Sequence, residues 1–258
     1  MITLTSDFGL KDPYVAEMKG VILAINPTAT IVDITHDVEK FNVRMAAFML
    51  ASAAPYFSQG TVHLAVVDPG VGTKRRAIVI QTQKGFFVGP DNGVLILAAQ
   101  SQAIEHIYEL TNTKHMLPKI SSTFHGRNIF APAVAYLDKG IQPCDFGPEI
   151  TTPVKPEYTL IKRKDDSIIG EVMHIDGFGN IITNINEKEI QKNCKVVTVE
   201  LPQVSLKVAF AKTYAQAKPQ EPVAIVGSHG FLEIALNQSN AAQKFHMKVG
   251  DKITIVAA

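Results

Sequence analysis

A carboxylate followed by paired arginines is the first candidate for chemistry in this sequence. In LAVVDPGVGTKRR (64–76), Asp68 follows a run of apolar residues and enters a Pro-Gly-x-Gly turn that leads to Arg75 and Arg76. An aspartate at a strand end stays charged beside an arginine, and the pair could orient a water molecule or a hydroxide ion. An ordinary turn with a surface ion pair would also explain the pattern.

A second carboxylate lies near the start of the chain, in TSDFGLKD (5–12), where Asp7 follows a strand-like run and Asp12 begins a helix-like one. Asp7 could accept two hydrogen bonds from a ribose diol, although no GxGxxG phosphate loop accompanies it. Turn formation and helix capping are the alternatives for the two aspartates.

Two more polar groups follow predicted strands or precede predicted helices. In STFHGRNIFAPA (122–133), His125 precedes Gly126, whose missing side chain would leave room for a ligand. With Asp68 and Arg75, His125 would supply an acid, a base and a charged clamp, although a lone histidine is more often structural. Asp91-Asn92-Gly93 also follows a strand, but this tripeptide is a common turn sequence.

The second half of the chain offers aromatic residues beside glycines, in HIDGFGNIITNI (174–185) and VGSHGFLEIALNQSNAA (226–242). Phe178 and Phe231 could present ring faces to a flat heterocycle, and Asn180 could read its edge. Packing in the core is the alternative for each phenylalanine.

Alternating strand-like and helix-like runs would position the first group of residues. Val15, Met18, Ile22 and Ile25 recur at helical spacing, with Asp12-Pro13 expected as an N-cap and a first-turn proline. Nearly continuous apolar strands predict an α/β domain with a mostly parallel central sheet covered on both faces. The expected strands are 1–6, 29–35, 61–68, 77–82, 85–90 and 103–110, and the expected helices are 12–27, 42–57 and 126–140.

A proline-rich segment with little periodicity, residues 140–166, resembles a connection between domains. We place the boundary near residue 160, which gives domains 1–160 and 161–258. Short strand-like runs separated by Gly, Pro, Asn and Asp predict a small antiparallel barrel or sandwich in the second domain. These runs are 167–176, 180–185, 195–201, 204–210, 222–228, 231–237 and 251–258.

Composition narrows the class of protein. With 46% hydrophobic and 19% charged residues the chain is predicted to be globular, and a net charge of +1 provides no global field for nucleic acid or an anionic membrane. Cys144 and Cys194 lack partners at metal-ligand spacing, which indicates neither a disulfide framework nor a zinc site. Without a signal-like start or an apolar run of spanning length, we expect a soluble, cytoplasmic protein.

Six blocks in the same order resemble the S-adenosylmethionine hydrolases, or hydroxide adenosyltransferases, which are relatives of fluorinase and chlorinase. The blocks are TSDFGLKD, VVDPGVGT.RR, GPDNG, TFHGR, DGFGN..TNI and GS.GFLEIA.N. The resemblance implies an N-terminal α/β domain, a C-terminal β-barrel and a homotrimer with sites at subunit interfaces. It also implies that water attacks the ribose 5′ carbon of S-adenosylmethionine, without a metal or other cofactor, to give adenosine and methionine.

The same resemblance implies roles for particular residues. Water activation is implied for Asp68, Arg75 and His125, and ribose binding for Asp7. At the methionine end, Asp12 would lie near the amino group, and further contacts are implied for Asp176 and Ser228. Adenine contacts are implied for Phe178 and Asn180. Phe231 remains a candidate for substrate contact. His229 departs from the family, which often has a small residue there, while the halogenases have an arginine.

Two other functions stay open at this point. The halogenases have tyrosines where this chain has Asp68 and His125, and a carboxylate would repel a halide ion in a poorly solvated site. A nucleoside-binding protein that holds its ligand without turnover is the alternative from another class.

Overall fold

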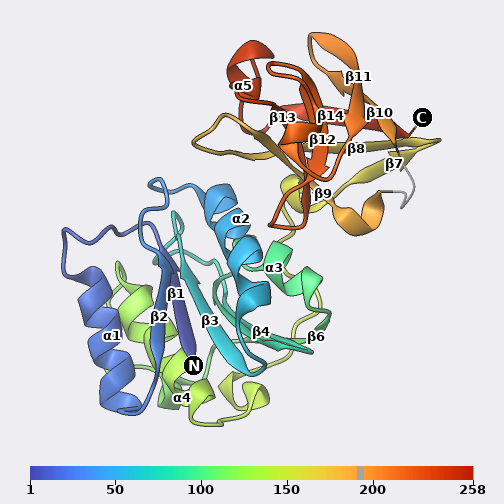
Figure 1. The fold of residues 1–258 in the computed structure, drawn as a ribbon. Coiled ribbons are helices and arrows are strands. Elements are labelled where there is room, and N and C mark those ends of the chain that lie inside the picture. The colour runs from blue at the N-terminus through green and yellow to red at the C-terminus, as the bar shows by residue number, and fades with distance from the viewer. Residues whose placement is uncertain (191–194, 258) are drawn as a thin grey trace. The chain divides into compact units, whose positions relative to one another are not determined.

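The computed structural model describes residues 1–190 and 195–257 of the chain. It divides into two compact units, Met1–Lys155 and Pro156–Ala258 (Figure 1). Each unit has its own hydrophobic core. The division falls a few residues before the boundary near residue 160 that the sequence suggested.

A six-stranded sheet forms the centre of the N-terminal unit, in the order β2-β1-β3-β5-β4-β6. Four adjacent strands, β2, β1, β3 and β5, run parallel to one another. Strand β4 is antiparallel to both of its neighbours, β5 and β6. The expected mostly parallel sheet is therefore confirmed, and a tight turn between β4 and β5 accounts for the antiparallel strand. The strands are β1 (Ile2–Ser6), β2 (Ile31–Thr35), β3 (Thr61–Val66), β4 (Ala77–Thr82), β5 (Gly85–Pro90) and β6 (Ile104–Glu109).

Helices cover both faces of this sheet, with α1 (Tyr14–Ile25) packed beside α4 (Ala131–Asp138) and α2 (Val43–Ala53) beside α3 (Ile96–Ser101) (Figure 1). Every residue of β1 and β3 is buried, as continuous apolar strands between two helical layers require. Because β3 is buried along its whole length, its carboxyl end has a fixed position, and the loop 67–76 that carries Asp68 begins there.

Local details of three helices differ from expectation. Pro13, and not Asp12, occupies the N-cap position of α1, and no side chain caps this helix. The expected helix 126–140 begins with a π-helical turn, Gly126–Phe130, because Pro132 has no N–H to donate to the Asn128 carbonyl. That carbonyl instead accepts from the Leu117 N–H at 2.9 Å. Helix α3 was not predicted, because its short apolar run resembles a buried strand.

Seven strands of the C-terminal unit close into a barrel through pairing of β14 with β8, so the barrel and not the sandwich is correct. Its pairs are antiparallel except β11 with β12, and the unpredicted β7 extends the β8 edge. The strands are β7 (Lys162–Lys164), β8 (Ser167–Ile175), β9 (Ile181–Asn186), β10 (Val196–Leu201), β11 (Val204–Phe210), β12 (Pro222–Val226), β13 (Phe231–Leu236) and β14 (Lys252–Ala257), with a short helix α5 (Ala241–Lys244).

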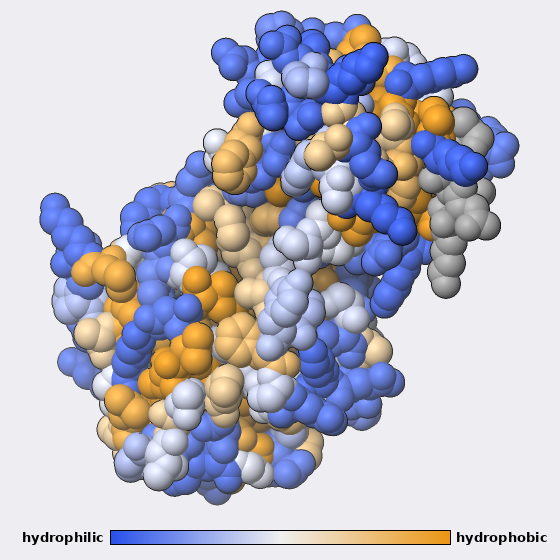
Figure 2. All heavy atoms as spheres, in the orientation of Figure 1, coloured by the Kyte–Doolittle hydropathy of each residue, from blue (hydrophilic) through white to orange (hydrophobic). Residues whose placement is uncertain are grey.

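Some surface features bear on the earlier expectations. None of the helices in the described residues is long and apolar enough to cross a membrane. Cys144 is an exposed free thiol, whereas Cys194 lies outside the described residues. Figure 2 shows hydrophobic side chains among the polar ones on the surface of the N-terminal unit, where Leu10, Phe41 and Tyr56 are among the exposed apolar residues.

Candidate active site

The loop that joins β3 to β4, residues 67–76, carries two of the three predicted catalytic residues. Asp68 follows β3 almost directly, and Arg75 lies two residues before β4. Gly72 has a φ of 77°, and a Cβ there would collide with the backbone carbonyl of Ser122. The loop therefore needs glycine for its left-handed turn and for its close approach to the segment that precedes His125.

Asp68 and Arg75 form a largely buried, multidentate ion pair. The Arg75 Nε donates to both carboxylate oxygens of Asp68 at 3.0 Å, and Nη2 donates to Oδ2. The two side chains are 6% and 11% exposed, and the guanidinium carbon lies 5.3 Å from the centre of the Phe130 ring. The surface ion pair considered as an alternative is therefore wrong, because little solvent reaches either group.

His125 contacts the same guanidinium, with 2.8 Å between its Nδ1 and the Arg75 Nη2. A guanidinium can only donate, so Nδ1 must accept and the ring proton must lie on Nε2. Burial lowers the pKa of His125, the positive charge of Arg75 lowers it further, and the negative charge of Asp68 opposes both effects. His125 is consequently a neutral ring at pH 7, with an Nε2–H that can donate.

A cavity of about 220 Å³ in the N-terminal unit brings four predicted site residues together. Asp7, Asp12, Asp68 and His125 line it, whereas Arg75 does not and so lies behind the wall that Asp68 and His125 form. The arrangement exposes a carboxylate and an imidazole N–H to the same small space. Such a pair can hold one water molecule by an acceptor and a donor.

The structure holds Asp7 in a fixed position. Its side chain is buried, its Oδ2 accepts a hydrogen bond from the Phe41 N–H at 2.8 Å, and its carbonyl oxygen accepts one from the Lys40 Nζ. Asp12 is exposed at the cavity rim and makes no helix-capping bond. The two aspartates thus give the cavity a second acidic side.

Aromatic residues that the sequence did not single out form another part of the cavity wall. The rings of Phe8, Tyr14 and Phe124 contact one another, with centroids 5.2 to 5.7 Å apart. Lys40 and Phe41 also line the cavity, and Phe41 adopts a φ of 66°. These residues come from the loop after β1, the start of α1, the loop after β2 and the segment before His125, so spacing along the chain gave no signal of their meeting.

Gly126 lines the N-terminal cavity and is closely packed there. A Cβ there would meet the Phe124 ring at 3.0 Å and the Met18 sulfur at 3.2 Å. The missing side chain therefore permits close packing against Phe124 and Met18 at the cavity wall, and the expectation that it opens space for a ligand stays a prediction. The π-helical turn that starts here, next to His125, is a form often found at functional sites.

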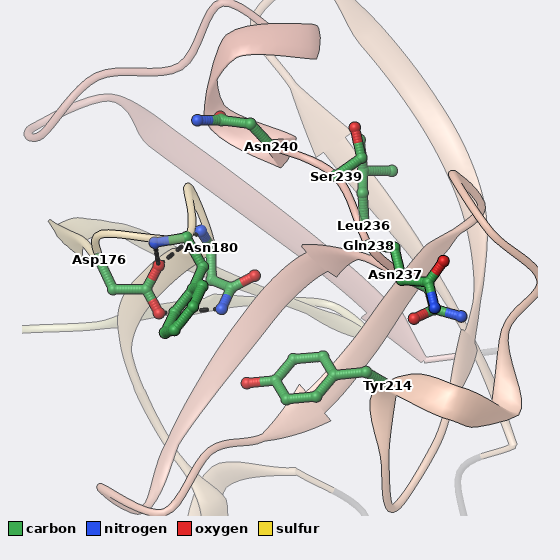
Figure 3. Close-up of a pocket in the computed structure, with 9 residues that line it drawn as sticks. Asp176, Asn180, Tyr214, Leu236, Asn237, Gln238, Ser239 and Asn240 are labelled. Carbon is green, nitrogen blue, oxygen red and sulfur yellow. Dashed lines mark hydrogen bonds between the residues drawn. The ribbon is translucent and has the colours of Figure 1, made fainter.

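The barrel contains a second cavity, of about 620 Å³. Asp176, Phe178 and Asn180 line it, as do residues the sequence did not single out: Tyr214, Leu236, Asn237, Gln238, Ser239 and Asn240. In Figure 3 the labelled side chains surround an open centre, with Tyr214 opposite Asn240. The polar run NQSN, which begins at the last residue of the expected strand 231–237, is the signal that could have indicated this wall.

The loop between β8 and β9 presents Phe178 and Asn180 to this cavity. Asp176 organises it, because Oδ1 accepts from the N–H groups of Phe178 and Asn180, and Oδ2 accepts from the Asn180 Nδ2, each at 2.9 Å. Asn180 is buried with its oxygen on the side away from Asp176 (Figure 3), whereas Phe178 is 81% exposed. Asp176 therefore acts first as a turn residue in this structure.

Three other candidates lie at the hairpin between β12 and β13 and do not line the barrel cavity. Ser228 is exposed, and the His229 Nε2 lies 3.4 Å from Oε2 of the buried Glu233. Phe231 is 5% exposed at the start of β13, with its ring centroid 6.0 Å from that of His229. The geometry of Phe231 agrees with the packing alternative.

Metal-ligand geometry is not evident in the described part of the chain, where no group of three or more His, Cys, Asp or Glu side chains could hold a metal ion. Of the aspartates of the N-terminal cavity, Asp68 is paired with Arg75, and Asp7 is bonded to the Phe41 N–H.

Comparison with known proteins agrees with this arrangement. Residues 2–147 match the model of the SAM hydroxide adenosyltransferase N-terminal domain, and residues 170–254 match that of the C-terminal domain. A protein of Salinispora tropica named (R)-S-adenosyl-L-methionine hydrolase is 38% identical, over 99% of this chain and 97% of its own. A crystal structure of an uncharacterized conserved protein from Thermotoga maritima superposes with a TM-score of 0.87 at 41% identity, covering 99% of this chain and 100% of that one.

A more distant relative, a fluorinase of Actinoplanes sp., is 27% identical over 100% of this chain and 98% of its own. The N-terminal domain model matches residues within the first unit, and the C-terminal domain model matches residues within the second. Together the two models cover most of the chain. The chain therefore belongs to the SAM hydroxide adenosyltransferase family.

Proposed function

We propose that this protein hydrolyses S-adenosylmethionine to adenosine and methionine. The observation that carries the proposal is the Arg75 side chain, which holds Asp68 and His125 together at the wall of the N-terminal cavity. Acidic groups and aromatic rings around that cavity favour a cationic substrate such as a sulfonium. Membership of the family and 38% identity to a hydrolase support the same conclusion.

In the proposed reaction, a water oxygen attacks the ribose 5′ carbon as the carbon–sulfur bond breaks. The bonding pair passes to sulfur, which leaves as the neutral thioether of methionine, so the leaving group needs no acid. Asp68 accepts a hydrogen bond from the water and then its proton, while the His125 Nε2–H donates to the water oxygen. The protein mainly aligns water, carbon and sulfur and excludes other solvent.

We assign the rest of the substrate to the two cavities. Asp7 would hold the ribose hydroxyls, and Asp12 would lie near the methionine amino group. Phe178 would stack on the adenine, and the Asn180 oxygen would accept a hydrogen bond from its edge. Contacts of Asp176 and Ser228 with the methionine end, and of Phe231 with the substrate, also stay part of the proposal.

The assembly and the location are proposed on the resemblance to the family. We expect a homotrimer in which one subunit's N-terminal unit and its neighbour's barrel complete each site. The protein is expected to work in the cytoplasm without a metal or other cofactor.

Product analysis tests this function. Purified protein is incubated with the (R) and (S) sulfonium epimers separately, because the name of the Salinispora relative specifies (R)-S-adenosyl-L-methionine. Chromatography should detect adenosine and methionine in equal amounts, with or without a chelator. Retention of adenosine without turnover would instead indicate a nucleoside-binding protein.

Halide is the competing nucleophile in the same experiment. A chloride ion 4 Å from the Asp68 carboxylate would be disfavoured by about 4 kcal/mol at an effective dielectric constant of 20. High chloride or fluoride should therefore leave adenosine as the product. Accumulation of a 5′-halogenated nucleoside would contradict the proposed hydrolysis.

Replacement of Asp68 tests the water-binding step. Asp68→Asn keeps the size of the side chain but removes its charge and its capacity to take a proton, so turnover should fall by about a hundredfold or more. Asp145→Asn, at an exposed position in the same unit, is the matched control and should retain full activity. Equal activity of the two variants would exclude Asp68 from the reaction.

A further inference from the structure

Two residues that the reaction does not use, Asp91 and Asn92, lie where the topology brings both ends of the catalytic loop together. In the sheet order β3-β5-β4, the loop 67–76 leaves β3 and enters β4, which is antiparallel to the intervening β5. The carboxyl end of β5 therefore meets the start of β4 and the end of β3 at one edge. Asp91 and Asn92 directly follow β5.

Asn92 contacts the first end of the loop. Its Nδ2 donates to the carbonyl oxygen of Val67 at 2.8 Å, and Val67 is the residue immediately before Asp68. Its Oδ1 accepts from the Val94 N–H at 3.2 Å, which fixes the direction of the amide. The backbone that carries the Asp68 carboxylate is thus held by a neighbouring strand.

Asp91 contacts the second end. The carboxylate is buried, and its Oδ2 accepts from the Arg76 Nε at 2.8 Å and lies 2.6 Å from Nη2. The Asp91 N–H donates to the Arg76 carbonyl at 3.0 Å, the same carbonyl that the Arg75 Nη1 approaches at 3.4 Å. The residue after Arg75 is thus held by both its side chain and its backbone.

The same carboxylate also contacts the end of the N-terminal unit. Its Oδ1 accepts from the Val154 N–H at 2.8 Å, and the Arg76 Nη2 donates to the Thr152 carbonyl at 2.5 Å. An Asp-Asn-Gly turn by itself would need neither the Val154 contact nor the Thr152 contact. Turn formation therefore does not explain why the Asp91 carboxylate is buried. Both oxygens of Asp91 are instead committed to holding the loop.

We propose that Asp91 and Asn92 are positioning residues that set the distances between Arg75, Asp68 and His125. This inference rests on the proposed hydrolysis, for which those distances matter. Asn92 fixes the loop next to Asp68, and Asp91 fixes it next to Arg75. Loss of either anchor lets the guanidinium move away from its two partners without removing any group that contacts substrate.

The first test uses Asp91→Asn, which keeps the volume but leaves an amide N–H₂ facing either Arg76 or the Val154 N–H. With S-adenosylmethionine, kcat should fall about tenfold to a hundredfold, since a shift of about 1 Å in catalytic groups has that effect. KM should change much less, because the cavity residues that would contact substrate are intact. Asn92→Ala should act in the same direction and serves if Asp91→Asn does not fold.

The second readout is the titration of His125, followed by NMR of its Cε1–H and assigned with His125→Gln. Arg75 and Asp68 are the charged groups that act on this ring. When Arg75 is held less firmly, the midpoint should rise toward that of an ordinary histidine. A purely structural role for Asp91 would lower stability and leave this midpoint unchanged.

Asp138→Asn is the control, because it removes a carboxylate that pairs with the N-terminal amine and Asn26 elsewhere in the same unit. It should lower stability without moving the His125 midpoint or kcat. An unchanged midpoint and kcat in both Asp91→Asn and Asn92→Ala would overturn the inference. The NMR readout needs no substrate, so absence of hydrolysis in the unmodified protein would refute the proposed function and leave this test of the geometry intact.

Discussion

Arg75 is the residue through which the candidate site is connected. Its planar guanidinium reaches the Asp68 carboxylate along one edge and the His125 ring through Nη2, while Phe130 packs against it. A lysine ammonium is a point charge without this fixed fork, and it could not hold both partners in one plane. Arginine thus determines two properties at once, the position of the carboxylate and the tautomer of the imidazole.

His63 is a second histidine whose protonation is controlled by its surroundings, here with a consequence for stability. Its ring is buried in β3, accepts or donates a hydrogen bond with the Thr3 hydroxyl at 2.8 Å, and stacks on Phe87. Burial, assisted by Lys84, lowers the pKa of His63 to about 4 from 6.5. The folded protein therefore keeps a neutral ring at a pH where the unfolded chain binds a proton.

Stability should consequently fall as the pH drops from about 6.5 to about 4, because the unfolded state gains protons first over that interval. The loss from this residue amounts to about 3 kcal/mol. Urea unfolding at pH 7 and at pH 4 would measure it against His63→Gln, which keeps a polar side chain but does not titrate. The same loss of unfolding free energy in both proteins would show that His63 does not contribute.

At the scale of elements, the loop 67–76 owes its shape to contacts on three sides. Strand β3 starts it, the residues after β5 hold it, and the segment before His125 packs on Gly72. A loop with so many neighbours can place charged groups within a few tenths of an ångström, as catalysis requires.

Gly72→Ala should disturb this loop. The new Cβ would meet the Ser122 carbonyl, and alanine at a φ of 77° adds about 1 to 2 kcal/mol of backbone strain. We expect a lower melting temperature together with at least a tenfold lower kcat, since both the Asp68 and His125 segments must shift.

Gly60→Ala separates the two effects, because Gly60 has a φ of 81° but no atom within 4 Å of its added Cβ. It should lower the melting temperature through backbone strain and leave kcat unchanged. If both variants lost the same activity, the contact between Gly72 and Ser122 would have no role in positioning the site.

At the scale of the whole molecule, each unit has a core and a cavity of its own. The N-terminal cavity, of about 220 Å³, is below the usual size for a nucleoside-sized ligand, whereas the barrel cavity, of about 620 Å³, is within it. The proposed function assigns different parts of the substrate to these two cavities.

Complementation between two inactive variants would test whether the division crosses subunits. Asp68→Asn alters the first unit, and Phe178→Ala combined with Asn180→Ala alters the second. If each site takes its two units from neighbouring subunits, random mixed trimers should regain about a quarter of the activity. Light scattering would establish the mass of the assembly.

Each variant measured alone provides the baseline for this experiment. Mixed assemblies of confirmed composition that show no recovery would place a complete site within one chain. A monomeric mass for the unmodified protein would contradict the proposed trimer directly.

Much of the fold was predictable because its signals are local. Apolar runs such as 61–68 and 77–82 became buried strands, and the helical spacing of Val15, Met18 and Ile22 became the buried side of α1. The π-helical turn Gly126–Phe130 was not predicted: Pro132 leaves the Asn128 carbonyl without a helical donor, and only the tertiary structure supplies the Leu117 N–H that replaces it. Strand β7, which has three exposed residues, had no hydrophobic pattern to reveal it.

The sequence by itself determined the alternation of strands and helices, the two-unit organisation and the set of acidic, basic and imidazole groups available for chemistry. Tertiary structure decided which of these groups meet: Asp7, Asp68 and His125 around one cavity, Arg75 behind it, and Asp91 on Arg76. The physical reason is that periodicity and turn chemistry act over a few residues, whereas hydrogen bonds between loop ends depend on strand order in the sheet.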